Sequence, residues 1–247
     1  MNNEPVVESS APGLRRRPRT PKGRAGEIHR RLALEYTDAL CELDHGNAFQ
    51  LLVATILSAQ CTDARVNMVT PVLFARYPEP VDLANANPTE LEELIHSTGF
   101  FKAKSRNLIA MATRLCDAFA GEVPGSMNDL TSLAGVGRKT ANVVRSVALD
   151  LPGLPVDTHV GRLAVRLGLT TETDPVKVEL ALNPLVAARE RGAFSLRLIL
   201  HGRRVCASRQ PACQSCALAD LCPSCTLPVA GTKPLKVVIG RKTQRET

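Results

Sequence analysis

Residues 48 to 60, AFQLLVATILSAQ, are apolar on nearly every side, and this run constrains the fold more than any other feature of the chain. A helix that is apolar all round has to be buried. Elsewhere the apolar residues recur at helical spacing, and no segment alternates convincingly as a half-buried strand does. The sequence therefore predicts an all-α fold around a central helix that ends just before Cys61.

A break in this helical pattern divides the chain. Residues 151 to 155, LPGLP, are too rigid and too prone to turns to be helical. We therefore expect two helical lobes that meet at this segment.

The 247 residues are 44% hydrophobic, enough for one large domain or two small ones. The chain has no apolar run of about 20 residues that would span a bilayer. It also has no apolar segment near the N-terminus that would act as a secretory signal. We therefore expect a cytoplasmic protein without a membrane partner, in which eight cysteines are poor material for disulfides.

The net charge of +7 is concentrated at the two ends of the chain. Residues 1 to 26 carry +4 and residues 226 to 247 carry another +4, so the body between them carries −1. Both ends have the composition of disordered basic tails that attract phosphate without specificity. Any specific contact between the body and a nucleic acid must then come from local geometry.

A glycine turn lies between two predicted helices, residues 126 to 133 and 138 to 149. Gly135 and Gly137 flank Val136, which permits a tight turn and leaves backbone N–H groups uncovered. Such a turn at a helix N-terminus can bind a phosphate. By itself the pattern is more often plain structure.

Four cysteines lie within 17 residues, and their spacing is C-x6-C-x2-C-x5-C. Four thiolates this close can hold a metal centre, and their chemistry allows zinc or an iron-sulfur cluster. A further cysteine, Cys225, lies outside the pattern and remains unassigned. The four are Cys206, Cys213, Cys216 and Cys222.

Three motifs occur in an order that resembles the endonuclease III family of DNA glycosylases. They are LSAQ at residues 57 to 60, the hairpin LAGVGRKTA at residues 133 to 141, and VDTH at residues 156 to 159, followed by the cysteine cluster. The resemblance extends from about residue 32 to residue 222. One departure is Ala134, because the family usually has proline before the first glycine.

The resemblance implies a fold in two parts. A six-helix barrel domain with the helix-hairpin-helix would comprise residues 41–152. An iron-sulfur cluster domain would comprise residues 27–40 and 153–225, with a [4Fe-4S] cluster on the four cysteines. We expect the cluster to serve a structural role.

Lys139 and Asp157 are the catalytic residues that the resemblance implies. A neutral lysine amine can attack the sugar C1′, form a Schiff base and lead to strand cleavage by β-elimination. A helix N-terminus in a partly desolvated pocket would favour the neutral amine. Asp157 is also a good helix N-cap, and it can combine this role with stabilising the cationic sugar.

Gln60 and Phe100 are our candidates for opening the duplex. A glycosylase extrudes its target nucleotide, so side chains have to occupy the vacated space. The amide of Gln60 can bond to the orphaned base, and Phe100 can wedge between bases. Phe101 is the alternative wedge. Without the resemblance, a helix-ending glutamine and a loop aromatic packed on the core are at least as good an interpretation.

Three arginines near Cys206 extend the expected DNA surface, because a metal-fixed loop could present them to phosphates. They are Arg203, Arg204 and Arg209.

The expected partner is duplex DNA that contains damaged bases or abasic sites. We expect the protein to be a monomer.

The sequence predicts a bifunctional glycosylase and abasic-site lyase that removes oxidised pyrimidines in base excision repair. One alternative is a monofunctional adenine glycosylase, although such relatives generally lack a lysine at the position of Lys139 and carry a further C-terminal recognition domain. Another alternative is a non-catalytic DNA-binding or redox-sensing module, in which Lys139 would be idle.

Overall fold

The computed structural model describes residue 18, residues 20–225 and residue 227. Every regular element in this part of the chain is a helix, so the all-α prediction is confirmed. The α-helices are α1 (Pro21–Glu35), α2 (Ala48–Leu57), α3 (Asp63–Arg76), α4 (Pro80–Ala84), α5 (Pro88–Ile95), α6 (Phe101–Phe119), α7 (Met127–Ser132), α8 (Arg138–Val147), α9 (Thr158–Arg166), α10 (Pro175–Leu182) and α11 (Arg191–Arg204). The short 3-10 helices are η1 (His96–Thr98), η2 (Asn183–Leu185), η3 (Ala188–Glu190) and η4 (Cys213–Ser215).

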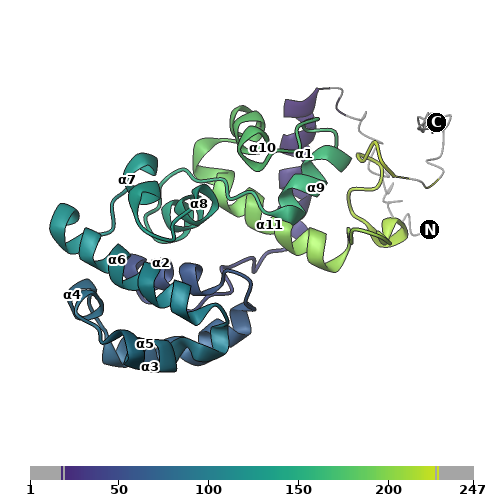
Figure 1. The fold of residues 1–247 in the computed structure, drawn as a ribbon. Coiled ribbons are helices and arrows are strands. Elements are labelled where there is room, and N and C mark those ends of the chain that lie inside the picture. The colour runs from purple at the N-terminus through teal and green to yellow at the C-terminus, as the bar shows by residue number, and fades with distance from the viewer. Residues whose placement is uncertain (1–17, 19, 226, 228–247) are drawn as a thin grey trace, which may run out of the picture.

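The buried side chains form two separate hydrophobic cores. One gathers apolar residues between positions 43 and 144, from the helices α2 to α8. The other joins α1 to residues 154 to 221, so the first described helix packs with the last ones. Figure 1 shows α1 beside α11, away from α2 to α6. We propose the same division into domains as before, with residues 41–152 in one domain and residues 27–40 and 153–225 in the other. The separation of the two cores supports this proposal.

Helix α2 is the buried centre of the first core. Seven of its ten residues are buried, and the Asn47 side chain caps it by accepting a 2.9 Å hydrogen bond from the Gln50 N–H. The helix ends at Leu57, earlier than the sequence predicts. Residues 58–61 form a turn instead, closed by a 3.0 Å bond from the Cys61 N–H to the Ser58 carbonyl.

Helix α1 begins at Pro21, which corrects the predicted tail of residues 1 to 26. Thr20 caps the helix, Pro21 occupies its first turn, and Ala25 is fully buried in the second core. The remainder of that predicted tail, residues 1–17 and 19, lies outside the described residues. So do residue 226 and residues 228–247 of the predicted C-terminal tail.

The segment that joins the two cores is extended. Residues 150 to 157 contain no helix, as the sequence of residues 151 to 155 predicts. Within the described residues, no helix is both long enough and apolar enough to cross a membrane.

Candidate active site

The glycine turn between α7 and α8 has the conformation that its sequence predicts. Gly135 has a φ of +77°, which L side chains rarely adopt, and a Cβ there would lie 3.1 Å from the Cβ of Asn107. Val136 is buried and anchors the turn in the first core. Gly137 precedes α8, and no described side chain caps that helix. The first N–H groups of α8 are therefore open to an anion.

Lys139 is the second residue of α8, directly after this turn. Its side chain lines a pocket but is exposed. The sequence predicts a partly desolvated Lys139 amine, and this prediction is wrong for the protein without a bound partner. A molecule bound over the pocket would have to exclude the water.

Asp157 is the N-cap of α9, as predicted. Its Oδ1 accepts two 2.8 Å hydrogen bonds, from the N–H groups of His159 and Val160. These bonds fix the carboxylate at the start of the helix. The carboxylate has a second oxygen, and the residue lines the same pocket as Lys139.

The extended segment before Asp157 is docked directly on α8. The Asn142 side chain accepts a 3.0 Å bond from the Leu154 N–H. Gly153 passes so close that a Cβ there would lie 2.4 Å from the Asn142 carbonyl oxygen. Because α8 also carries Lys139, this contact sets the position of Asp157 relative to the lysine.

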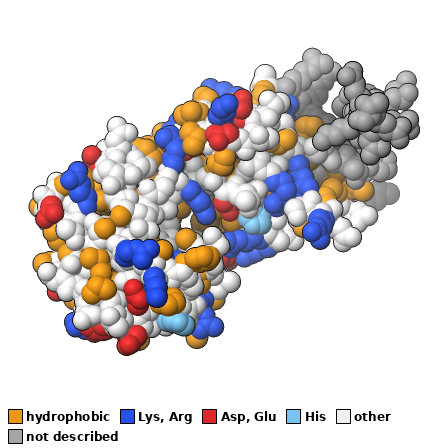
Figure 2. Space-filling view, in the orientation of Figure 1, with side chains coloured by type: hydrophobic (Ala, Val, Ile, Leu, Met, Phe, Trp, Pro, Cys, Tyr) orange, Lys and Arg blue, Asp and Glu red, His pale blue; other side chains and the backbone are white. Residues whose placement is uncertain are grey.

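The pocket that holds Lys139 and Asp157 has a volume of about 360 Å³. It is lined by residues from both cores, including Leu43 of the first core and Ile199 of α11 in the second. Figure 2 shows the hollow between the two parts of the molecule, with basic and acidic side chains around it. Its size lies in the range of small-molecule sites.

Charged side chains from both parts of the molecule meet at the rim of the pocket. Arg203 forms ion pairs with Glu42 and, at 3.7 Å, with the Asp63 carboxylate. Burial raises the pKa of Asp63, and Glu42 adds to this, whereas Arg203 and Lys139 oppose it. Asp63 is therefore electrostatically linked to the lysine, a connection that sequence reasoning missed.

Gln60 and Phe100 both have left-handed backbone conformations, with φ values of 54° and 49°. Such conformations are uncommon for residues with a side chain and are frequent at functional sites. Both side chains project from turns, and Phe100 is 64% exposed. Phe101 is less accessible, since its ring packs at a tilt against His96 with a centroid distance of 4.4 Å.

A buried lysine joins these two turns. The Lys104 ammonium donates hydrogen bonds to the carbonyls of Leu57 and Thr98, at 2.7 and 2.8 Å. Its residue is only 4% exposed. Burial lowers the pKa of Lys104.

The cysteine loop surrounds a second pocket next to α9 and α11. Cys206, Cys213, Cys216 and Cys222 all line it, and so does Cys225. None of these five cysteines forms a disulfide. No group of three His, Cys, Asp or Glu side chains in the described part of the chain could hold a single metal ion. The thiols therefore surround a space instead of converging on one point.

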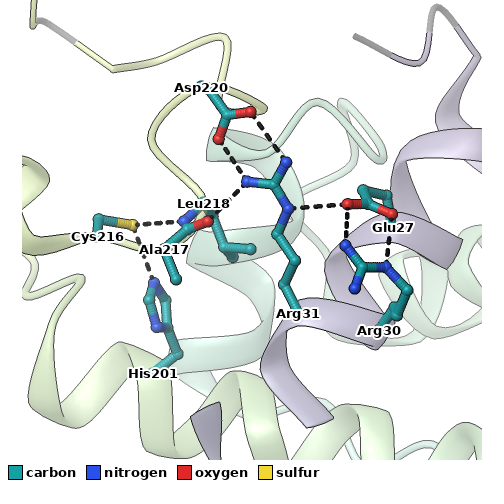
Figure 3. Close-up of polar contacts among 8 residues, drawn as sticks. All are labelled: Glu27, Arg30, Arg31, His201, Cys216, Ala217, Leu218 and Asp220. Carbon is teal, nitrogen blue, oxygen red and sulfur yellow. Dashed lines mark hydrogen bonds and ion pairs between the residues drawn. The ribbon is translucent and has the colours of Figure 1, made fainter. Parts of the chain in front are cut away.

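Several groups are placed to bond to the cysteine sulfurs. The Leu218 N–H and the His201 Nε2 each lie 3.4 Å from the Cys216 sulfur (Figure 3), and the Arg166 guanidinium donates to the Cys206 sulfur at 3.3 Å. Burial lowers the pKa of His201 to about 4, so the imidazole is neutral. Tyr36, 3.0 Å from the Nδ1, can donate to it, leaving a hydrogen on the Nε2 for the sulfur.

Helix α1 holds the same loop from the other side. Arg31 donates to the Ala217 carbonyl at 2.9 Å and forms an ion pair with Asp220 (Figure 3). Glu27, one turn earlier in the helix, also bonds to Arg31. Contacts between protein groups alone therefore fix the loop to the second core.

The three predicted arginines do not gather around Cys206. Arg203 points to the rim of the active-site pocket, and the Arg204 guanidinium lies 5.7 Å from the centre of the Tyr36 ring. Arg209 is exposed in the cysteine loop. Adjacent residues of a helix point in different directions, which explains why neighbours in sequence have separate contacts. Arg166, which sequence reasoning missed, contacts the cysteine loop instead.

Comparisons with known proteins agree with this geometry. The profile of the HhH-GPD superfamily of base excision DNA repair proteins matches residues 53–188. Endonuclease III of Synechocystis sp. is 52% identical over 212 residues, which cover 85% of this chain and 97% of that protein. This chain belongs to the endonuclease III family. Endonuclease III of Bacillus subtilis is 43% identical, with coverage of 76% and 86%.

Two solved endonuclease III complexes with DNA have the same architecture. One is a non-covalent complex and the other is a trapped covalent intermediate, and both are 42% identical to this chain with a TM-score of 0.77. They cover 82% of this chain and 95% and 96% of the respective solved chains. A thermostable thymine-DNA glycosylase, 22% identical with a TM-score of 0.73, shares the fold.

One further contact positions the hairpin of this endonuclease III family member. Arg138, which precedes Lys139, forms two hydrogen bonds of 2.7 and 2.9 Å with the carboxylate of Glu179 on α10. Asn142 also donates to this carboxylate at 2.9 Å. No local pattern predicts this pairing, because 41 residues separate Arg138 from Glu179.

Proposed function

We propose that this protein is a bifunctional DNA glycosylase and abasic-site lyase of base excision repair. The observation that carries the proposal is that Lys139 and Asp157, each at the start of a helix, line one pocket beside a glycine hairpin. Membership of the endonuclease III family and likeness to a DNA complex trapped as a covalent intermediate support it. The substrate is duplex DNA that contains an oxidised pyrimidine or an abasic site.

Lys139 is the nucleophile in this mechanism. Its neutral amine attacks C1′ of the extruded nucleotide, and the damaged base leaves with the electrons of the glycosidic bond and gains a proton. The C1′–O4′ bond of the sugar ring then breaks, the ring oxygen gains a proton, and a Schiff base remains between the Nζ and C1′. Loss of a C2′ proton then expels the 3′ phosphate, and water releases the lysine.

Asp157 provides the negative charge that this chemistry requires. Its carboxylate is held by two backbone N–H groups, so it keeps its place while positive charge develops on the sugar. A carboxylate beside the lysine can also accept the proton that the ammonium must lose. Gly135, Val136 and Gly137 direct the open N–H groups at the start of α8 toward the DNA phosphate nearby, whereas the Val136 N–H itself bonds to the Leu133 carbonyl at 3.1 Å.

Gln60 and Phe100 occupy the space that the extruded nucleotide leaves. Both project from strained turns at the edge of the first core, and the exposed ring of Phe100 is free to enter a base stack. Arg209 is proposed to contact phosphate from the cysteine loop, whose backbone Arg166 holds through bonds to Ala207 and Ser208. Arg203 and Arg204 take part only if DNA displaces their present contacts.

A [4Fe-4S] cluster on Cys206, Cys213, Cys216 and Cys222 is proposed as the cofactor. The four thiols surround a pocket that is also lined by Leu163, Leu167 and Ala219, which suits a buried inorganic group. The N–H donors around the sulfurs would stabilise thiolates. When bound, the cluster would link distant parts of the loop and so stabilise its fold. Zinc and no iron after anaerobic purification would contradict this choice.

Borohydride trapping tests the lyase assignment. The protein is incubated with abasic duplex DNA and the reductant, and Lys139→Ala is compared with the wild type. We expect a covalent adduct with the wild type and none with the variant. Folded, metal-loaded wild type that forms no adduct would exclude the lyase and leave the non-catalytic module. Release of mispaired adenine without strand cleavage would favour the monofunctional alternative.

A further inference from the structure

A fifth thiol lines the cysteine pocket. Cys225 lies outside the four-cysteine pattern of the family, yet its side chain faces the same space as Cys206, Cys213, Cys216 and Cys222. It is half-buried and free. The pocket therefore offers one more thiol than the four that the proposed cofactor would use.

The local backbone places Cys225 next to Cys222. The Cys225 N–H donates to the Cys222 carbonyl at 3.2 Å, which closes a four-residue turn through Pro223 and Ser224. A turn of this kind brings its first and fourth residues close together. Cys222 is itself fixed by a 3.0 Å bond from its N–H to the Leu218 carbonyl.

The contacts of the other thiols support this pairing. The Cys216 sulfur faces His201 and the Leu218 N–H, and the Cys206 sulfur accepts from Arg166. Cys225 therefore lies on the Cys222 side of the pocket, because the turn joins it to that residue.

We propose that Cys225 is a reserve ligand, which binds the cluster in place of Cys222 when the Cys222 sulfur is unavailable. This inference rests on the cofactor proposed above. In the exchange, the Cys225 thiol loses its proton to water and its sulfur bonds to the iron that the Cys222 sulfur would otherwise occupy. One thiolate replaces another, so the charge and the oxidation state of the cluster are unchanged.

Four variants of the full chain, purified anaerobically, test the proposal by their iron and sulfide content. Cys222→Ser should retain the cluster within about twofold of wild type, and Cys225→Ser alone should retain it fully. Cys222→Ser/Cys225→Ser should lose it by more than about tenfold, a loss that removal of a ligand readily causes. Cys216→Ser is the matched control, because no spare thiol lies on its side, and it should lose the cluster as well.

Alkylation followed by peptide mass spectrometry shows which sulfur is bound. In wild type the Cys225 thiol is free and should react with iodoacetamide. In Cys222→Ser it should be protected while the cluster is present and reactive after chelation of the iron. This readout does not depend on enzymatic activity.

Loss of the cluster in both Cys222→Ser and Cys222→Ala would overturn the proposal, whether or not those variants remain helical by circular dichroism. So would retention of the cluster with Cys225 still fully reactive, since another group would then be the fourth ligand. Wild type that binds no iron would instead refute the cofactor proposal, so the two failures are distinguishable.

Discussion

The buried ammonium of Lys104 donates a 2.7 Å hydrogen bond to the backbone carbonyl of Leu57, which ties α6 to the last turn of α2. Its second bond goes to Thr98, two residues before Phe100, and Leu57 lies three residues before Gln60. The ammonium therefore connects both turns that carry the residues proposed to open the duplex. It also offsets the negative end of α2, where helix carbonyls lack partners.

Lys104→Met tests this connection. The variant keeps an apolar stem of similar length but leaves two buried carbonyls without their donor, so the free energy of unfolding should fall by about 1–3 kcal/mol. Cleavage of duplex abasic DNA should slow more than cleavage of single-stranded abasic DNA, which needs no opening. Urea denaturation and single-turnover rates on the two substrates measure these effects.

Lys102→Met is the matched control for this variant, because Lys102 is exposed two residues earlier on the same helix. It should leave the stability and the ratio of the two rates unchanged. If Lys104→Met slows cleavage of duplex and single-stranded abasic DNA equally, Lys104 does not position the residues that are proposed to open the duplex.

Glu179→Gln should weaken the support of the hairpin. The buried Glu179 carboxylate accepts both bonds from Arg138, next to Lys139, so its neutralisation should lower kcat more than it raises KM. The free energy of unfolding should fall by about 1–2 kcal/mol. This is less than the roughly 3–5 kcal/mol expected when a fully buried ion pair is broken, because the Arg138 side chain is 37% exposed. Glu90→Gln, which breaks the exposed pair with Arg76, should change the stability much less, because water screens that pair. Similar losses in both variants would contradict this argument.

His29 gives the stability a dependence on pH near neutrality. Burial lowers the pKa of His29 below 6.5, against the opposing effect of Glu190 and with a smaller contribution from Arg197. The unfolded chain therefore binds the proton first, and stability should decrease as the pH falls below 6.5. His29→Gln should reduce this decrease, as measured by chemical denaturation at a series of pH values. An unchanged slope would show that another group is responsible.

Much of the fold and part of the site could be predicted because the signals are local. Asn87 caps α5 and Asp157 caps α9 through bonds to N–H groups two and three residues ahead, so each cap can be read from a short window of sequence. The buried α2 is equally visible in its composition. Lys139 and Asp157 could be named because motifs similar to those of a known family surround them.

The remaining features depend on contacts between distant residues. Nothing near Lys104 distinguishes it from the exposed Lys102, and only the packing of α6 against α2 makes it a buried donor. Arg203 was wrongly grouped with the cysteine loop because its partners Glu42 and Asp63 lie about 140 to 160 residues earlier. The start of α1 was missed for the same reason, since Ala25 is buried by the C-terminal core.

The two glycines of the hairpin should have different roles, although they lie two residues apart. Gly135→Ala places a side chain at a φ of +77° and 3.1 Å from Asn107, so it should destabilise the protein by about 1–2 kcal/mol. Gly137→Ala meets nothing within 4 Å and has an ordinary φ of −87°, so its stability should be close to wild type.

Gly137→Ala should nevertheless weaken binding of DNA, because its methyl group lies at the N-terminus of α8, where the phosphate is proposed to approach the open N–H groups. Binding to a short abasic duplex, measured by fluorescence anisotropy at fixed salt, and thermal unfolding of both variants separate the two effects. Wild-type affinity in a folded Gly137→Ala variant would mean that the phosphate binds elsewhere on the hairpin.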